Sequence, residues 1–177
     1  NLHSDAVRYD AALTLYKKAL TIHQANKDVY NQAVTQNSMG TTYLRQGKNT
    51  EAASKYFAAL KLAESIDNSG LKALCLNNIS LLYLEQSNYK KALTYQQQAL
   101  AFHKQNEDTY GMAAVESSMA NTYLLLKDTG KAKQLYAEAL QHYKINGDMI
   151  GEATVYTNLA NLYNVNDSSR HYKLQAQ

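Results

Sequence analysis

The stretch "SSMANTY" at residues 117–123 decides how this chain is organised, because it nearly recurs three more times. The related stretches are "NSMGTTY" at 37–43, "NNISLLY" at 77–83 and "TNLANLY" at 157–163. Every copy ends in tyrosine, and each tyrosine lies forty residues after the previous one. Repetition at a fixed period of this size is typical of supersecondary units that stack on their neighbours to bury a shared core.

Other positions repeat with the same period, and most of them hold small residues. Three alanine columns and one leucine column run through the chain. They are Ala33, Ala73, Ala113 and Ala153; Ala12, Ala52, Ala92 and Ala132; Ala19, Ala59, Ala99 and Ala139; and Leu20, Leu60, Leu100 and Leu140. A unit of forty residues with several fixed small positions predicts elements that approach each other closely.

The spacing inside one unit is helical. In "AVTQNSMGTTYLR" (33–45) the residues Ala33, Met39, Gly40 and Tyr43 fall on one face of a helix, together with Gln36. The stretch "QGKNT" (46–50) then breaks the pattern, and "EAASKYFAALKLAESI" (51–66) resumes it. Each unit is therefore predicted to hold a helix A, a short turn, a helix B and a linker. The chain contains no proline that would break such helices.

Short polar residues precede the predicted helices, where a side-chain oxygen can accept hydrogen bonds from the first free N–H groups. The column before helix A reads Asp28, Asn68, Asp108 and Asp148, and Asn88 and Asp128 hold the same place before helix B. A second column of small residues should let helix B approach helix A. It reads Gly40, Ser80, Ala120 and Ala160. The repeated tyrosine that follows is expected to fill the wedge between units.

The pattern Met39-Gly40-x-x-Tyr43, followed by Ala52-x-x-x-Tyr56 and Ala59, resembles the signature of the tetratricopeptide repeat family. The chain departs from the family in lacking tryptophan and the closing proline, and in its period of forty instead of about 34 residues. This longer form resembles repeats of Pins-type adaptors, kinesin light chains, and bacterial sensor kinases and regulators. The resemblance implies an all-α, right-handed superhelix of antiparallel helix pairs.

The predicted domain organisation is one array over residues 1–177. We expect a lone helix B at 5–25, helix pairs at roughly 32–68, 72–108 and 112–148, and a helix A at 152–164. The corresponding boundaries are a partial repeat at 1–28, repeats at 29–68, 69–108 and 109–148, and a partial repeat at 149–177. That last segment, "NVNDSSRHYKLQAQ", lacks the alanine column, so we expect only a short, irregular remnant of helix B there.

Composition argues against several classes of function. The net charge is only +3, and the lysines come singly or in pairs, so no basic stripe for nucleic acid is expected. No apolar run is long enough to cross a bilayer, and no signal peptide opens the sequence. Cys75 is the only cysteine, which fits a reducing compartment. A cytoplasmic protein is therefore expected, with an extracytoplasmic sensory segment as the alternative.

The sequence offers no catalytic or cofactor motif, so neither an enzyme nor a bound cofactor or metal is expected. "GKNTE" (47–51) lacks the glycine and strand of a phosphate-binding loop. His23 and His103 share a phase but lie two repeats apart, roughly 20 Å by the spacing of packed helices, which is too far to share one metal ion. Cys75 has no histidine three or four residues away, and a buried structural thiol is favoured over a nucleophile.

The resemblance implies that the helices A line a concave groove. The predicted groove residues are Asn37, Thr41, Asn77, Asn78, Ser117, Asn121, Thr157, Asn158 and Asn161. Amides offer donors and an acceptor together, so they could pair with the backbone of an extended peptide. The alternative is that these side chains are solvated or bond to neighbouring helices. The chaperone-tail clamp of this family is not expected, because Asn37, Ala114 and Ser118 stand where its cations would be, and only Asn78 matches.

Three functions remain open from the sequence. The first is a non-enzymatic scaffold that binds a protein or an extended peptide, within a larger signalling or adaptor protein. The second is the sensory segment of a bacterial histidine kinase or transcription regulator. The third is a structural array that self-associates through its exposed ends.

Overall fold

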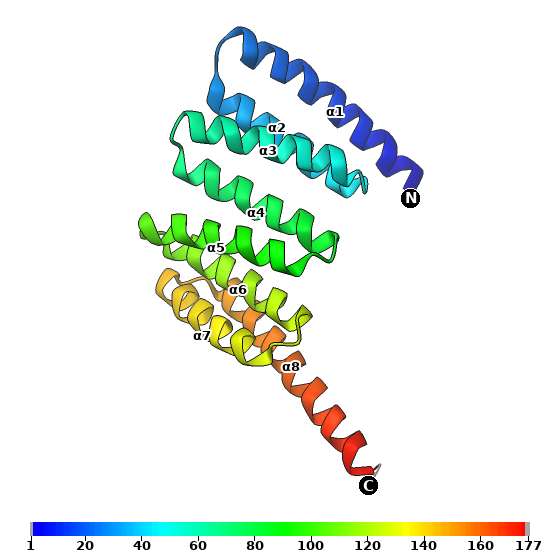
Figure 1. Cartoon of the computed structure of the whole chain (residues 1–177), viewed down its shortest axis with the longest axis vertical. Helices are drawn as coiled ribbons and strands as arrows, with labels where there is room; N and C mark the ends of the chain where they lie inside the picture. The colour runs from blue at the N-terminus through cyan, green and yellow to red at the C-terminus, as the bar shows by residue number, and fades with distance from the viewer. Residues whose placement is uncertain (1, 176–177) are drawn as a thin grey trace. The chain divides into compact units, whose positions relative to one another are not determined.

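The computed structural model describes the backbone of residues 2–175 and the side chains of residues 7–163. The described chain is helical, without strands, which confirms the predicted all-α class (Figure 1). The helices are α1 (Leu2–Ala25), α2 (Val29–Arg45), α3 (Asn49–Ser65), α4 (Ser69–Glu85), α5 (Tyr89–Gln105), α6 (Thr109–Leu125), α7 (Thr129–Asn146) and α8 (Met149–Gln175). Their starts repeat with the forty-residue period of the sequence, so α2, α4, α6 and α8 are helices A. The chain divides into two compact units, Asn1–His103 and Lys104–Gln177.

The polar columns cap the helices as predicted. Before α2, α4, α6 and α8, a side-chain oxygen accepts a hydrogen bond from the backbone N–H three residues later, over 2.8–3.1 Å. Asn88 and Asp128 make the same contact at the starts of α5 and α7. These bonds satisfy donors that a helix start leaves without an intrahelical partner, and removing one typically costs about 1 kcal/mol.

The turns between helices have a feature that the sequence did not reveal. One residue in each turn adopts a left-handed conformation, with φ between 47° and 71°. These residues recur every twenty positions: Lys27, Gly47, Asp67, Ser87, Glu107, Lys127 and Gly147. Glycine adopts this conformation without strain, whereas other residues pay a steric cost. Only two of the seven are glycines, so most turns carry that cost.

In the first unit, helix A and helix B meet through a glycine and a tyrosine. The ring of Tyr56 on α3 lies against Gly40 on α2, and a Cβ atom built at Gly40 would lie 2.6 Å from a ring carbon. This explains the small column that the sequence showed. Tyr56 is fully buried with Ala52, and Ile79 and Leu82 of α4 complete the cluster.

The second unit repeats this packing with different residues. Ala120 on α6 and Tyr136 on α7 are fully buried in one cluster that also contains Val155 of α8. At the end of α7, the ring of Tyr143 lies against Gly151 of α8, where an added Cβ would lie 2.3 Å from a ring carbon. The equivalent positions in the first unit are Ala63 and Leu71, which are buried together.

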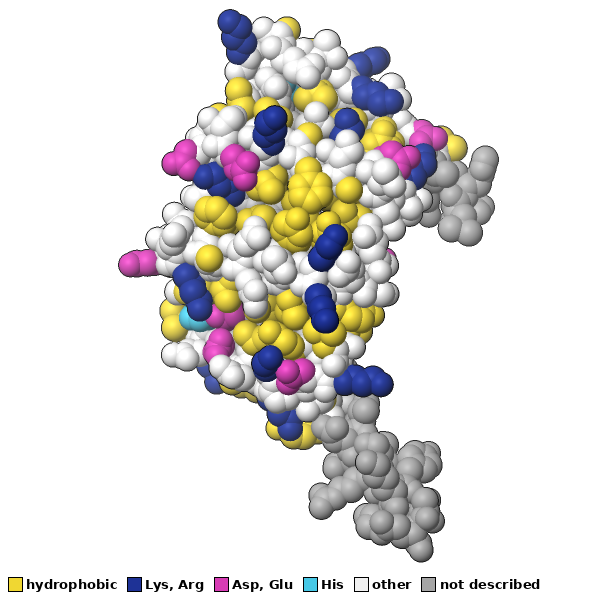
Figure 2. Space-filling model, viewed as in Figure 1, with side chains coloured by type: hydrophobic (Ala, Val, Ile, Leu, Met, Phe, Trp, Pro, Cys, Tyr) yellow, Lys and Arg dark blue, Asp and Glu magenta, His cyan; other side chains and the backbone are white. Residues whose placement is uncertain are grey.

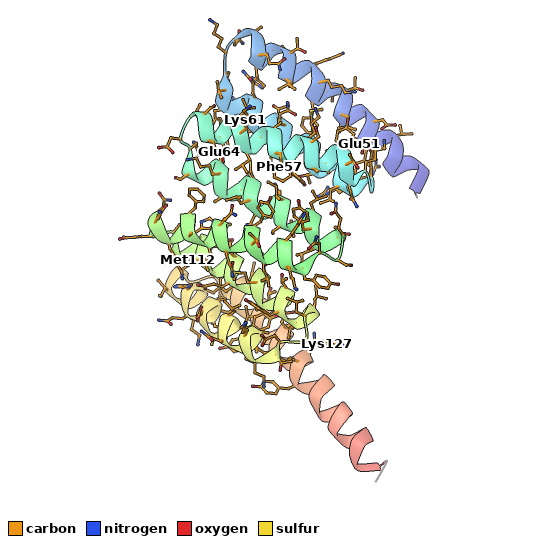
Figure 3. All side chains as sticks on the ribbon, in the orientation of Figure 1. Glu51, Phe57, Lys61, Glu64, Met112 and Lys127 are labelled. Atoms are coloured by element: carbon orange, nitrogen blue, oxygen red, sulfur yellow. The ribbon has the colours of Figure 1, made fainter. Side chains whose placement is uncertain are left out.

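Three members of the repeated tyrosine column, Tyr43, Tyr83 and Tyr123, pack half-buried at the edge of these clusters, as the wedge prediction requires, whereas Tyr163 is exposed. Tyr83 stacks on Tyr95 of α5 with ring centroids 5.4 Å apart, and Lys91 Nζ lies 5.1 Å from the centroid of Tyr83. Tyr95 also meets Phe57 of α3 edge-on. Hydrophobic side chains gather on the face of the first unit seen in Figure 2, and Figure 3 labels Phe57 there, 38% exposed.

The last helix differs from the expectation for its segment. A helix A at 152–164 and a truncated helix B after it are predicted from the sequence, whereas α8 runs as one helix from Met149 to Gln175. No turn occurs at Asp167, the counterpart of the left-handed Gly47. The physical reason lies in the missing alanine column: position 172 holds tyrosine where a helix B needs a small residue to pack on helix A.

Candidate functional site

In the first unit, the predicted groove residues bond mainly to one another. Asn37 is buried on α2, and Asn78 of α4 donates from Nδ2 to Asn37 Oδ1 over 2.9 Å. Thr41 accepts a hydrogen bond from the Tyr56 hydroxyl over 3.2 Å. Asn77 is half-buried. Part of the amide capacity that the sequence assigned to a peptide therefore holds helices together.

In the second unit the predicted groove residues that form hydrogen bonds do so with Tyr136 and with the backbone. The Tyr136 hydroxyl donates to Asn121 Oδ1 and also hydrogen-bonds to Asn158 of α8. Ser117 is buried, whereas Thr157 is exposed and donates to the Ala153 carbonyl over 2.8 Å. Asn161 is exposed on α8. In both units a buried helix-B tyrosine thus reaches the helix-A residue fifteen positions earlier.

A pocket of about 460 Å³ opens between α1 and α2 in the first unit. On α2 it is lined by Asn37 and Thr41, two of the predicted residues, and by Ser38 and Arg45. From α1 it takes Arg8, Tyr9, Ala12 and Tyr16. These α1 residues are not among the predicted groove residues, because the family resemblance places the groove on helices A alone. The signal was present, since Tyr16 occupies the column of Tyr56 and Tyr136.

The chemistry of the pocket is polar, aromatic and cationic. Its described lining carries two arginines and no acidic side chain. At its rim, Gln46 Nε2 donates to Asp10 Oδ1 over 3.0 Å and ties α2 to α1. Burial raises the pKa of the Tyr56 hydroxyl, and the bond to Thr41 and the charge of Arg45 oppose that shift. Guanidinium groups donate to carbonyl or carboxylate oxygens, and tyrosine rings offer flat apolar walls.

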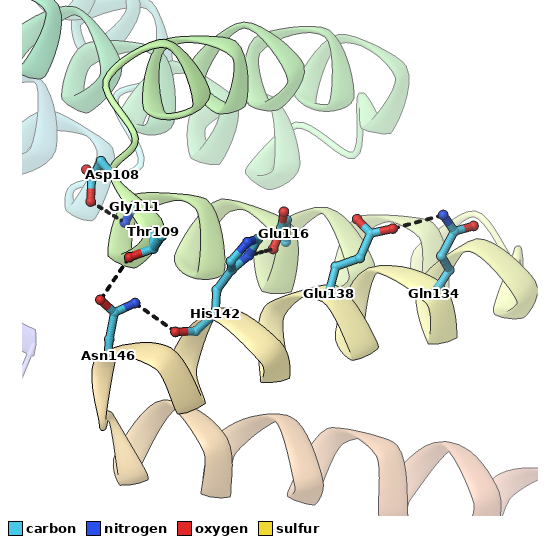
Figure 4. Close-up of polar contacts among 8 residues, drawn as sticks. All are labelled: Asp108, Thr109, Gly111, Glu116, Gln134, Glu138, His142 and Asn146. Carbon is cyan, nitrogen blue, oxygen red and sulfur yellow. Dashed lines mark hydrogen bonds and ion pairs between the residues drawn. The ribbon is translucent and has the colours of Figure 1, made fainter.

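One buried ion pair in the second unit was not foreseen. Glu116 of α6 is 1% exposed, and its Oε2 lies 2.8 Å from Nδ1 of His142 on α7 (Figure 4). Burial raises the pKa of the Glu116 carboxyl, while the hydrogen bond and charge of His142 oppose the shift. The two residues are 26 positions apart on different helices, so no local sequence motif predicts that they form a pair. The pair lies inside the packed unit.

The other candidates for chemistry are structural. Cys75 is fully buried on α4, and burial raises the pKa of its thiol to about 12, so the reactive thiolate is scarce at neutral pH. Among the described side chains, no three of the His, Cys, Asp and Glu type gather closely enough to hold a metal ion. Within the same part of the chain, none of the helices combines the length and the apolar character needed to cross a membrane.

Comparison with known proteins agrees with the repeat geometry. A family model described as tetratricopeptide repeat matches residues 2–65 and 31–105, more than half of the chain. The chain belongs to the tetratricopeptide repeat family. No curated protein matches the sequence.

Several solved structures share the fold of this tetratricopeptide protein at low sequence identity. BtubC (BKLC) from P. vanneervenii matches with a TM-score of 0.79 and 20% identity, over 92% of this chain and 66% of that one. Aspartyl phosphate phosphatase F from Bacillus subtilis matches with a TM-score of 0.75 and 19% identity, over 88% and 40%. The TPR domain of Arabidopsis FLU gives 0.61 and 21%, over 66% and 98%. At these identities the likeness establishes the fold alone.

Proposed function

We propose that this chain is a protein-interaction scaffold that receives a polypeptide segment of a partner in the pocket between α1 and α2. Tetratricopeptide repeats are generally protein-interaction scaffolds. The observation that carries the proposal is the pocket itself, which joins two predicted groove residues, Asn37 and Thr41, to Arg8, Tyr9 and Tyr16. No catalytic role is proposed for any of these residues.

The lining suits the backbone of a polypeptide. The two guanidinium groups offer donors for peptide carbonyls, and Tyr9 and Tyr16 can cover apolar side chains. The Ser38 hydroxyl already donates to the Val34 carbonyl, so its oxygen can serve as an acceptor for a peptide N–H group. The groove residues outside the pocket that remain exposed, Thr157, Asn121 and Asn161, are proposed as secondary contacts. The Oδ1 atoms of Asn37 and Asn121 already accept hydrogen bonds from Asn78 and Tyr136. The choice of partner is therefore proposed to depend more on the arginines and tyrosines of the pocket than on the asparagine side chains.

The scaffold is further proposed to act within a larger signalling or adaptor protein. This chain spans 66% of the BtubC chain and 40% of the phosphatase F chain that it resembles in fold. The coding sequence on either side of residues 1–177 tests this part of the proposal. An effector domain in the same reading frame supports it, and a separate protein of this length would contradict it.

A peptide-display selection on the purified chain tests the pocket. The decisive variant is Ala12→Trp, which fills the pocket from α1, and the matched control is Ala11→Trp, whose side chain lies exposed on the same helix. Far-ultraviolet circular dichroism confirms that both fold. We expect an enriched peptide family to bind the parent and Ala11→Trp and to be lost from Ala12→Trp. No enrichment, or equal binding by all three proteins, would overturn the proposal.

A further inference from the structure

The turn that follows α7 begins with Asn146-Gly147, the only place in the chain where glycine follows asparagine. Asn146 is the last residue of α7, and both residues are exposed. We propose that Asn146 is a modification site, which loses its side-chain amide by spontaneous cyclisation at a rate that a hydrogen bond from Thr109 controls. None of these residues lines the pocket between α1 and α2, so this site is additional to the proposed scaffold function.

The reaction uses the backbone nitrogen of Gly147 and water. The Gly147 nitrogen loses its proton and forms a bond to Asn146 Cγ, while the side-chain nitrogen takes up a proton and leaves as ammonia. A cyclic imide results, and water then opens it at either carbonyl carbon. Opening at Cγ gives aspartate, whereas opening at the main-chain carbon gives isoaspartate, in which the backbone continues through Cγ.

The surroundings of Gly147 favour this attack. Gly147 has no side chain that could hinder its nitrogen, and nothing lies within 4 Å of the position that a Cβ atom would occupy. It adopts φ 67° and lies just outside the helix. Because helix ends fray, its N–H group is released more readily than one in the middle of α7. Exposure of Asn146 and Gly147 brings water to the reacting atoms.

Three hydrogen bonds oppose the attack in the folded turn. Asn146 Nδ2 donates to the His142 carbonyl over 2.7 Å, and Thr109 Oγ1 donates to Asn146 Oδ1 over 2.9 Å (Figure 4). The Gly147 N–H donates to the Lys144 carbonyl over 3.1 Å. Cyclisation requires the amide and the N–H group to leave these partners, so each bond should slow the reaction.

Thr109 is the only one of these partners that lies on another helix. His142 and Lys144 belong to α7 itself, whereas Thr109 is the first residue of α6 and lies 37 positions before Asn146. The bond therefore joins the start of α6 to the end of α7, and these helices share one buried cluster that keeps their ends together. Loosening this contact should free the amide and speed its loss.

The products should weaken the turn in which they form. Loss of the amide replaces the donor Nδ2 with a carboxylate oxygen beside the His142 carbonyl, so an attraction becomes a repulsion. The new charge lies at the C-terminal end of α7, where the helix dipole disfavours an anion. Isoaspartate also lengthens the backbone at the point where α7 ends. Both products are therefore expected to loosen the contact between α6 and the end of α7.

Peptide mapping by mass spectrometry, after incubation of the folded protein at pH 8 and 37 °C, tests the site and its control. Thr109→Val removes the hydroxyl at nearly constant shape, and Thr109→Ser is the matched control that keeps it. In the parent, aspartate and isoaspartate should accumulate at position 146 faster than at any other asparagine. The reaction should be roughly threefold faster in Thr109→Val, because the exposed bond makes a modest contribution, and unchanged in Thr109→Ser. Far-ultraviolet circular dichroism confirms that all three proteins fold.

Two further readouts test the chemistry and its consequence. The rate should rise from pH 6.5 to pH 8.5, because the attacking nitrogen must lose its proton. Asn146→Asp imitates one product, and it should lower the urea midpoint of the protein. Gln141→Glu makes the same change from amide to acid at an exposed residue of α7, further from the helix end, and should leave the midpoint nearly unchanged.

Three results would overturn the inference. One is a parent in which position 146 is unmodified while the protein in denaturant reacts there. Another is faster modification at a different asparagine of the folded parent. The third is an equal rate in the parent and Thr109→Val, which would show that the bond from Thr109 does not control the reaction. None of these outcomes bears on the pocket, whose test is the peptide selection.

Discussion

At the scale of single residues, packing within the repeats buries ionisable side chains and raises their pKa values. Cys75 lies on α4, a helix A, where its thiol is fully buried, and this burial raises its pKa to about 12. Glu116 occupies a column that holds Gln36, Leu76 and Tyr156 in other repeats, and it is buried beside His142. In each case burial is the main cause of the raised pKa.

The buried thiol gives the first prediction. In native protein at pH 8, Cys75 should not react with a disulfide reagent such as DTNB, because the thiol is protonated and covered. In denaturant it should react completely, with one thiol per chain. The absorbance of the released chromophore measures both states. Rapid reaction in the native protein would contradict the burial assigned to Cys75.

The buried carboxyl gives the second prediction, through Glu116→Gln. Because burial raises the pKa of Glu116, the folded state binds its proton more tightly than the unfolded state. The stability that this preference contributes is complete below the unfolded pKa of about 4.3 and is lost as pH rises through the folded value. The glutamine variant lacks this loss, so its advantage in the free energy of unfolding should grow from pH 4 to pH 7.5.

Urea denaturation of the parent and Glu116→Gln at both pH values is the measurement. If the variant instead becomes the less stable protein as pH rises, the attraction between His142 and the ionised carboxylate outweighs the cost of burying it.

At the scale of helices and turns, the positive-φ residues give a third prediction. Lys127, labelled in Figure 3, adopts φ 61° in the turn between α6 and α7. Lys127→Gly should raise the free energy of unfolding by about 1 kcal/mol, because glycine removes the steric cost of the left-handed conformation. Lys127→Ala should give no such gain, since alanine keeps a Cβ atom. Gly47→Ala should lose about 1 kcal/mol. Equal effects of glycine and alanine at position 127 would refute the strain.

The fourth prediction concerns a pair of contacting residues that compensate in volume. Gly151 lies against Tyr143 in the second unit, whereas Leu71 lies beside Ala63 at the same columns of the first. Gly151→Leu alone should destabilise the protein by about 3 kcal/mol or more, because its Cβ already overlaps the ring. Adding Tyr143→Ala should recover most of that loss by recreating the pair of the first unit. Thermal denaturation of the two single variants and the double variant decides this. Additive losses would show that the two positions are not coupled.

At the scale of the whole molecule, the repeated columns predicted much of the fold because helix periodicity and helix capping depend on residues close together in the sequence. The period located each helix A, and capping oxygens such as Asp28 and Asn68 marked the starts. The left-handed turns escaped prediction because Lys27 and Glu107 carry no turn signature. The pocket escaped because Arg8 and Tyr9 come from a helix B, and the pair of Glu116 and His142 because it joins distant positions. The proposed groove contacts remain predictions, because many of those side chains also bond within the units.

Photo-crosslinking from inside the pocket tests the central claim most directly. Benzoylphenylalanine replaces Tyr9, which lines the pocket, and in a control it replaces Tyr30, which is exposed on α2. The purified protein is irradiated alone and with a peptide from the display selection, and adducts are mapped by mass spectrometry. Position 9 should form adducts with the added peptide, and position 30 should form none. An absence of adducts at position 9, or the same adducts from both positions, would contradict a protein-binding pocket between α1 and α2.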